Sequence, residues 1–228
     1  MAMIVTIDGP AGSGKSTVAR KLAARLEIAY LDTGAMYRAI AHAALTRNLD
    51  FSDEHAVIEL ARSIHLDLDC GPKNTRVRVD GHDVSEALRT MEVSELTSRV
   101  AGIQAVRDQL VERQRAIGRK LGSFVTEGRD QGSVVFEHAD AKFVLDASPE
   151  KRAQRRLHDM LADGEEVSLQ EVLASIVARD AVDRVKWSTL LEPGQAIVID
   201  TTDLTLHEVV ELLADHIKSG SCSGQISD

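Results

Sequence analysis

The stretch Gly9-Pro10-Ala11-Gly12-Ser13-Gly14-Lys15-Ser16 decides the fold, because it fits the phosphate-binding pattern G-x-x-x-x-G-K-[ST]. Before it, Met3-Ile4-Val5-Thr6-Ile7 is an apolar, β-branched run that predicts a buried parallel strand. After it, Val18, Leu22 and Leu26 recur at helical spacing. Strand, glycine-rich loop and helix form the setting that this motif requires, so the stretch predicts a loop that binds a nucleoside triphosphate.

The residue types of the loop explain how it would hold phosphate. Gly9, Gly12 and Gly14 can adopt positive φ and let the backbone approach a ligand closely. The loop N–H groups and the start of the helix then predict an anion cradle. We expect Lys15 to reach the β- and γ-phosphates and the Ser16 hydroxyl to hold Mg²⁺. The predicted triphosphate contacts are Gly9, Pro10, Ala11, Gly12, Ser13, Gly14, Lys15, Ser16 and Thr17.

Composition limits the partners of the chain. Its 228 residues suffice for one α/β domain, and 43% hydrophobic residues provide a full core, while 3% aromatics leave few candidates for base stacking. The formal charge of −9 argues against a nucleic-acid polymer or an anionic membrane as partner. Cys70 and Cys222 lack metal-ligand spacing, which suits a reducing cytoplasm. We expect no signal peptide and no membrane span, and therefore a cytoplasmic protein, and we expect a monomer.

Strands and helices alternate along the chain. Strands are predicted at 3–7, 28–32, 124–127, 142–146 and 196–200, with helices between them. This alternation indicates a parallel sheet between helices. Alternating apolar and charged residues at 64–69 and 75–80 predict an antiparallel β insert, with a mainly helical stretch from 85 to 121.

Charged residues near the ends of the predicted strands are the further site candidates. Arg38 lies near the start of a helix, beside the carboxyl end of a strand, where α/β proteins bind ligands. Glu127 ends another strand and is a candidate to contact Mg²⁺ through water. The pair Arg129-Asp130 follows it between glycines. Arginines also cluster at 152–156 and 179–184, in a chain that is otherwise acidic.

Three classes of phosphate-binding protein compete. A switch GTPase should carry D-x-x-G and N-K-x-D elements, and neither exists here, since neither Asn48 nor Asn74 precedes a lysine. Size and charge disfavour a motor or repair ATPase that acts on polymers. A small-molecule kinase needs cations around the transferred phosphoryl group, which the arginine clusters supply. The sequence therefore favours a kinase.

Several further motifs, in order, resemble one kinase family. The matching stretches are Ile7–Pro10, Leu31–Arg38, Asp83–Ser85 with Arg89, Glu92–Ser94, Val106-Arg107 with Gln114-Arg115, Glu127–Asp130 with Gly132–Phe136, Leu145–Ser148, and Arg179-Asp180 with Asp183. The chain is thus similar, over residues 3 to 217, to the bacterial cytidylate kinases, which are P-loop nucleoside monophosphate kinases. The resemblance implies Mg²⁺-dependent transfer of the γ-phosphoryl of ATP to CMP or dCMP, in pyrimidine salvage and recycling.

The resemblance also implies a fold and a domain plan. It implies a five-stranded parallel sheet between helices, with a small antiparallel β insert and a helical lid. We expect a single P-loop kinase domain at 1–218, a monophosphate-binding insert at about 63–86, and a lid at about 150–167. Residues 219–228 are small and polar, and we expect a disordered tail.

Roles for single residues follow from the same resemblance. The implied CMP contacts are Thr33, Arg38 and Arg129 at the phosphate and sugar, Ser98, Arg107 and Asp130 at the cytosine edge, and Arg179 and Asp183 at the ribose hydroxyls. Arginine can donate to O2 and N3 of cytosine, and a carboxylate accepts from its amine. The implied lid arginines are Arg152, Arg155 and Arg156, with Arg152 in contact with ATP. The implied catalytic residues are Lys15, Arg129, Arg155 and Arg156.

The chain departs from the family pattern at three places. Lys186 stands where the family has an arginine, Ser188-Thr189-Leu190 lacks the family's proline, and Gln131 replaces an apolar residue. Lysine cannot make the bidentate contact of an arginine. Two alternatives stay open: a kinase of another small acceptor such as UMP or shikimate, and a regulatory nucleotide-binding protein without catalysis, against which Lys15 and Ser16 argue.

Overall fold

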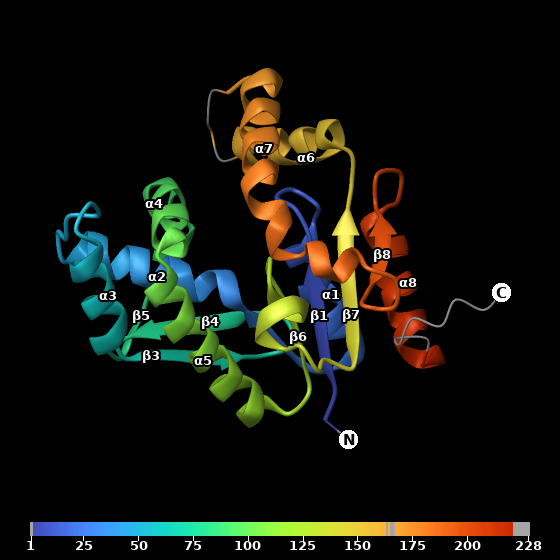
Figure 1. The fold of residues 1–228 in the computed structure, drawn as a ribbon, viewed down its shortest axis with the longest axis horizontal. Helices are drawn as coiled ribbons and strands as arrows, with labels where there is room; N and C mark the ends of the chain where they lie inside the picture. Colours follow the sequence, from blue (N-terminus) through green and yellow to red (C-terminus); the bar gives the residue numbers. More distant parts are fainter. Residues whose placement is uncertain (1, 163, 165–166, 221–228) are drawn as a thin grey trace. The chain divides into compact units, whose positions relative to one another are not determined.

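The computed structural model describes residues 2–162, 164 and 167–220 (Figure 1). The chain divides into two compact units, and each is described by itself. Unit 1 consists of residues 1–27 and 125–228, and unit 2 of residues 28–124. Within the described ranges, no helix combines the length and apolar character needed to cross a membrane.

The central sheet has five strands in the order β2-β6-β1-β7-β8. Their bounds are β1 (Ile4–Asp8), β2 (Ala29–Asp32), β6 (Phe124–Glu127), β7 (Ala141–Asp146) and β8 (Ile197–Asp200). Both β1 and β8 pair with β7 in parallel register. The predicted five-stranded parallel sheet is therefore confirmed, with strand ends within one or two residues of the expected ones.

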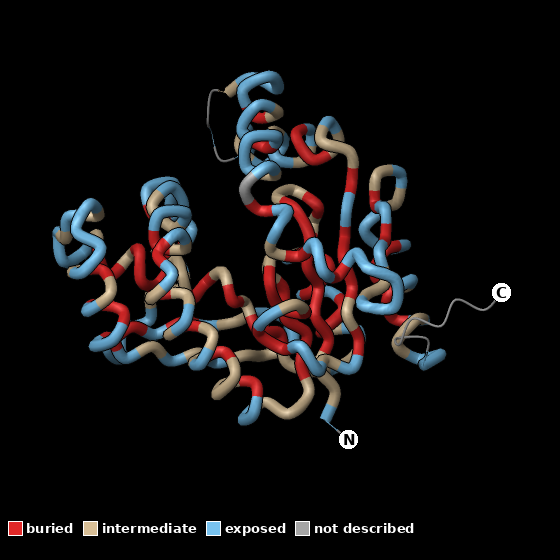
Figure 2. Tube along the Cα trace, viewed as in Figure 1, coloured by how far each residue is buried: buried red, intermediate tan, exposed pale blue. Residues whose placement is uncertain are grey.

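Helices of unit 1 begin where the sequence supplies caps. They are α1 (Lys15–Leu26), α6 (Pro149–Ala162), α7 (Leu169–Asp183) and α8 (Leu206–Ser219). Ser148 accepts a hydrogen bond from Lys151 N at 3.2 Å, and Ser168 and Thr205 open capping boxes. The helices α6 and α7 pack against each other, as do α1 and α8. Figure 2 shows the buried residues of this unit concentrated along β1 and β7.

Unit 2 carries the predicted antiparallel insert. Its elements are β2, α2 (Thr33–Thr46), α3 (Glu54–Ser63), β3 (Leu66–Cys70), β4 (Thr75–Val79), β5 (His82–Asp83), α4 (Met91–Gly102) and α5 (Gln104–Leu121). Strands β3, β4 and β5 form an antiparallel sheet, in which Asp80 and Gly81 turn the chain with φ of 49° and 83°. The predicted helical stretch from 85 to 121 breaks at Ile103, between α4 and α5.

Part of the predicted domain plan lies outside the described residues. The lid at about 150–167 includes residues 163 and 165–166, and the tail at 219–228 includes 221–228 with Cys222, all outside the described residues. The single kinase domain with its insert, lid and tail stays a prediction.

Candidate functional site

The glycine-rich loop runs from the end of β1 into α1. Gly9, Gly12 and Gly14 have φ of 135°, 76° and 87°, values that side chains of L-residues rarely allow. A Cβ at Gly9 would overlap the carbonyl oxygen of Leu145 in β7. A Cβ at Gly12 would lie 3.0 Å from the carbonyl oxygen of Arg152 in α6. The shape of the loop is therefore fixed by close packing against its own unit, before any nucleotide is considered.

Lys15 is a buried cation folded back into this loop. Its Nζ donates to the Pro10 carbonyl oxygen at 2.6 Å and lies 3.4 Å from Ser13 Oγ, and the residue is 4% exposed. Burial and the positive charge of Arg129 lower the pKa of Lys15 well below its usual value, although Glu127 and Asp8 act in the opposite direction. A bound anion would offset that unfavourable desolvation.

Ser16 and Glu127 bring two oxygen donors together beside Lys15. The exposed Ser16 Oγ donates to Glu127 Oε1 at 2.9 Å, and Glu127 is 7% exposed at the end of β6. Hydroxyl and carboxylate oxygens are the ligands that Mg²⁺ takes, usually with phosphates and waters completing the set. Among the described residues, no group of three or more His, Cys, Asp or Glu could hold a metal ion by itself. The pair therefore fits a Mg²⁺ that arrives with a phosphate ligand.

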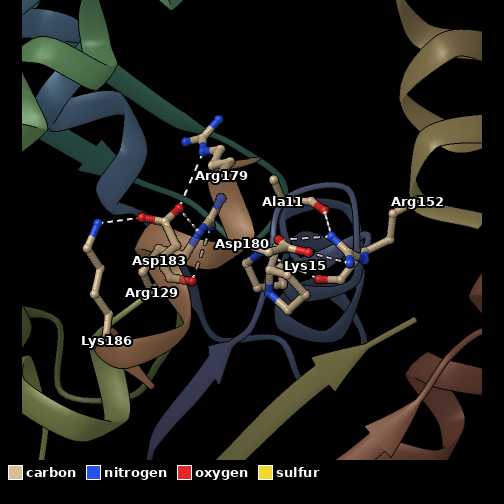
Figure 3. Close-up of polar contacts among 11 residues, drawn as sticks. Ala11, Lys15, Arg129, Arg152, Arg179, Asp180, Asp183 and Lys186 are labelled. Carbon is tan, nitrogen blue, oxygen red and sulfur yellow. Dashed lines mark hydrogen bonds and ion pairs between the residues drawn. The ribbon is translucent and has the colours of Figure 1, made fainter. Parts of the chain in front are cut away.

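Arg152 on α6 is enclosed by protein oxygens. Its Nη1 and Nη2 lie 3.1 and 2.6 Å from the two carboxylate oxygens of Asp180 on α7 (Figure 3). Its Nε donates to Ala147 O at 2.9 Å and Nη1 to Ala11 O at 3.1 Å, and the residue is 3% exposed. The guanidinium thus joins α6, α7 and the glycine-rich loop. Its predicted contact with ATP stays a prediction.

The other two α6 arginines have different surroundings. Arg155 donates to the backbone oxygen of Thr201 at 2.7 Å, to its hydroxyl at 3.1 Å and to Ser13 O at 3.5 Å. Burial lowers the pKa of Arg155. Arg156 is exposed and lines a pocket of about 310 Å³, to which Ala11, Gly12 and Arg179 also contribute. Arg156 is therefore exposed at a pocket that adjoins the glycine-rich loop.

Asp183, at the end of α7, is the centre of a cation cluster. Its carboxylate lies 3.4 Å from Arg129 Nε, 3.3 Å from Arg179 Nε and 2.5 Å from Lys186 Nζ (Figure 3). Burial acts to raise the pKa of Asp183, but the Lys186 hydrogen bond and the neighbouring arginines outweigh it and lower the pKa. Burial, together with Arg179, also lowers the pKa of Arg129. One carboxylate thus faces three cations.

The segment after β6 holds the predicted Arg129-Asp130 pair. Asp130 is 9% exposed, and residues 131–135 form a π-helical turn. Gln131, where the family has an apolar residue, is 1% exposed and accepts a hydrogen bond from Thr126 Oγ1 at 3.1 Å. A buried hydrogen bond therefore compensates the polar side chain at this position.

The remaining predicted acceptor contacts belong to unit 2. Thr33 is the buried first residue of α2, capped by Asp32, which accepts a hydrogen bond from Ala35 N at 2.9 Å. Arg38, one turn further, pairs with the other oxygen of Asp32 at 2.9 Å. Ser98 lies on α4 and Arg107 on α5. Their roles toward an acceptor stay predictions.

Two residues with prominent contacts lie outside the predicted set. Asp180 follows Arg179 directly in the sequence and forms an ion pair with Arg152, 28 residues earlier. No sequence motif joins these two positions. Thr201 follows the last strand, is 2% exposed, and binds Arg155 across 46 residues. Such pairings depend on how α6, α7 and β8 pack, so local sequence patterns carry no signal for them.

Comparison with known proteins gives the family. The family model described as cytidylate kinase matches residues 5–219. A cytidylate kinase of Caldanaerobacter subterraneus subsp. tengcongensis is 46% identical over 218 residues, which are 95% of each chain. A bifunctional pantoate ligase/cytidylate kinase of Synechococcus sp. (strain JA-3-3Ab) is 47% identical over 90% of this chain, which spans 39% of that longer relative.

A solved structure supports the fold alone. The shikimate kinase of Bacteroides thetaiotaomicron aligns with a TM-score of 0.53 and 11% sequence identity, covering 96% of this chain and 99% of its own. The sheet order, the glycine-rich loop with its buried lysine, and the match of the family model over nearly the whole length agree with one another. The chain belongs to the cytidylate kinase family.

Proposed function

We propose that this protein transfers the γ-phosphoryl group of ATP to CMP or dCMP, giving CDP or dCDP. The observation that supports it most is the buried cation of Lys15, which is 4% exposed, lies within the glycine-rich loop and has its pKa lowered by burial and by the positive charge of Arg129. Cations held in this way favour a polyanionic ligand. Membership of the cytidylate kinase family then selects the acceptor.

The donor side of the proposal uses the glycine-rich loop. Its N–H groups and Lys15 would bind the polyphosphate of ATP, with Lys15 exchanging its bond to Pro10 O for phosphate oxygens. Ser16, and Glu127 through water, would hold Mg²⁺, which when bound neutralises phosphate charge. Arg155 and Arg156 would supply further positive charge from the lid, and lid closure would exclude water and so suppress hydrolysis of ATP.

The acceptor side of the proposal uses the residues that the resemblance implies. Thr33, Arg38 and Arg129 would hold the phosphate and sugar, and Arg179 and Asp183 the ribose hydroxyls. Ser98, Arg107 and Asp130 would read the cytosine edge, because this set supplies both donors and an acceptor. The reaction then needs no covalent intermediate, since positioning and charge stabilisation suffice for in-line transfer. We also propose a cytoplasmic monomer that acts on nucleotides rather than on nucleic acid polymers.

The first experiment measures ADP formation from Mg·ATP with CMP, dCMP, UMP, AMP and shikimate in parallel. We expect strong turnover of CMP or dCMP, which Asp130→Ala reduces by more than tenfold, because the base-reading carboxylate is lost. Asp140→Ala, which removes an exposed carboxylate of the same unit, is the matched control and should retain activity. Preferential turnover of another acceptor would contradict the CMP assignment, and absence of turnover despite ATP binding would support a regulatory protein.

A further inference from the structure

Asp8 is a buried carboxylate to which the proposed mechanism gives no role. It is the last residue of β1, directly before Gly9, and it is 0% exposed. Each of its two oxygens accepts one backbone hydrogen bond: Oδ1 from Gln131 N and Oδ2 from Gly132 N, both at 2.8 Å. One side chain therefore fastens two successive peptide groups of a distant turn.

The fastened turn lies immediately after the Arg129-Asp130 pair. Before that pair, Gly128 N donates to the backbone oxygen of Ile7 at 3.1 Å. After it come the two bonds to Asp8. Arg129 and Asp130 are thus the two residues enclosed between successive attachments to the end of β1, the strand that leads into the glycine-rich loop.

A carboxylate suits this place better than its neutral analogues. An ionised carboxylate accepts at both oxygens, whereas an asparagine amide accepts at one and presents N–H groups at the other. Burial raises the pKa of Asp8 to about 6, although the N–H groups of Gly132 and Gln131 act to lower it. A buried charge of this kind is unfavourable unless hydrogen bonds compensate it, as the Gln131 and Gly132 N–H groups do here.

Packing around Gly132 shows how closely the turn approaches Asp8. A Cβ on Gly132 would lie 3.2 Å from Asp8 Oδ2 and 2.8 Å from Thr6 Oγ1. No side chain therefore fits between the turn and β1 without displacing one of them. The contact is direct backbone against carboxylate, which leaves little freedom to the residues next to it.

We propose that Asp8 is a positioning residue, which fixes Arg129 and Asp130 relative to the glycine-rich loop and thereby sets the place of the acceptor nucleotide. This inference rests on the proposed function, because it takes Arg129 and Asp130 as acceptor contacts. Asp8 itself is fully enclosed by protein. Its effect is transmitted through the Gln131 and Gly132 peptide groups.

The test compares Asp8→Asn with Asp140→Asn. Both acids accept backbone N–H groups next to β1, but Asp140 is exposed and bonds Ile4 N at the opposite end of the strand, at 2.7 Å. In Asp8→Asn we expect KM for CMP to rise roughly tenfold or more, because a charge-assisted hydrogen bond is replaced by an N–H facing an N–H. ATP affinity, measured by direct titration, should change by less than about threefold. Asp140→Asn should leave both values unchanged.

Hydrogen exchange gives a second measurement that does not depend on activity. The Gln131 and Gly132 amides of the nucleotide-free protein should exchange at least tenfold faster in Asp8→Asn than in wild type. If wild type phosphorylates no cytidine nucleotide, the proposed function fails, while the exchange comparison still tests the positioning by Asp8. Unchanged exchange in a folded variant, or a KM for CMP equal to that of wild type, would overturn the inference.

Gly132→Ala moves the turn without altering Asp8 and decides the matter if Asp8→Asn does not fold. Its added methyl group pushes against Asp8 Oδ2 and Thr6 Oγ1. We expect the same selective rise in KM for CMP, at least fivefold, with ATP affinity retained. An unchanged KM in this variant would show that the place of the turn does not matter to the acceptor.

Discussion

Two acids on α7, Asp180 and Asp183, lie three residues apart and do different things with charge. Asp180 holds one arginine, Arg152, which is 3% exposed and bound at both carboxylate oxygens. Asp183 faces three cations from three segments, with side-chain exposures of 22% for Arg129, 53% for Arg179 and 26% for Lys186. The first is a closed pair, whereas the second is an open cluster with more positive than negative charge. A closed pair serves the fold, and an open cluster can exchange partners with an anionic ligand.

The largest expected effect concerns the closed pair. Arg152→Ala should lower the free energy of unfolding by about 3 kcal/mol, because it leaves Asp180 and two backbone oxygens without their donor. Urea unfolding followed by circular dichroism measures this loss. The control is Arg156→Ala, an exposed arginine of the same helix, which should change stability by less than about 0.5 kcal/mol. Equal stability losses for the two arginines would contradict a structural role for the pair of Arg152 and Asp180.

The open cluster should show its effect in catalysis rather than in stability. Asp183→Asn is expected to raise KM for CMP by about tenfold, because it removes an acceptor for the ribose and leaves three cations repelling one another. Its loss of unfolding free energy should be smaller than that of Arg152→Ala. Steady-state kinetics at saturating ATP, with urea unfolding of the same sample, checks both statements. An unchanged KM together with a large loss of stability would show that Asp183, like Asp180, stabilises the fold and does not serve the acceptor.

The pH dependence of stability sharpens the comparison further. The cations around Asp183 hold the folded-state pKa of its carboxyl group below the ordinary value of 3.8. The carboxylate therefore binds a proton less readily in the native state than in the unfolded state. The stabilising contribution of Asp183 is therefore fully present above pH 4 to 5 and is lost as pH falls through the folded-state pKa. The difference in unfolding free energy between wild type and Asp183→Asn should be constant from pH 7 to 5 and shrink below about pH 4. A difference that grows on acidification would contradict this sign.

The smallest expected effect comes from restoring the family's arginine. Lys186→Arg would offer Asp183 a planar fork in place of the single ammonium, which now lies 2.5 Å from Oδ1. Because the cluster already holds two arginines, we expect a change of no more than about threefold in KM for CMP and about 0.5 kcal/mol in stability. A change above tenfold would mean that the fork geometry at this position, rather than the charge of the cluster, governs acceptor binding.

The sequence predicts the fold because its signals are local. The five strands and the antiparallel insert each follow from the period of apolar residues within a short window. The phosphate-binding loop is predictable for the same reason. Its glycines, its lysine and its serine stand within eight residues, and the structure gives those glycines the positive φ that their type allows.

Partnerships between distant residues could not be predicted in this way. Asp180 binds Arg152, which lies 28 residues away in the sequence. Asp8 accepts hydrogen bonds from Gln131 and Gly132, which lie more than 120 residues away. An arginine in a helical lid has the same local pattern whether its guanidinium faces a nucleotide or a carboxylate of a neighbouring helix. Sequence patterns therefore identify which residues carry charge, and packing decides how each charge is used.

Gly9 and Lys15 together offer a way to recognise related proteins that have lost phosphoryl transfer. Its φ of 135° and its contact with the Leu145 carbonyl are demands of the sheet, so they persist in a protein that never meets a nucleotide. Lys15, in contrast, is a desolvated cation that is unfavourable without an anion to bind. In a related protein that has lost phosphoryl transfer, we expect Gly9 to be retained, because the sheet requires it, and Lys15 to be replaced first. The glycine thus indicates an intact fold, whereas the lysine indicates that the loop still binds phosphate.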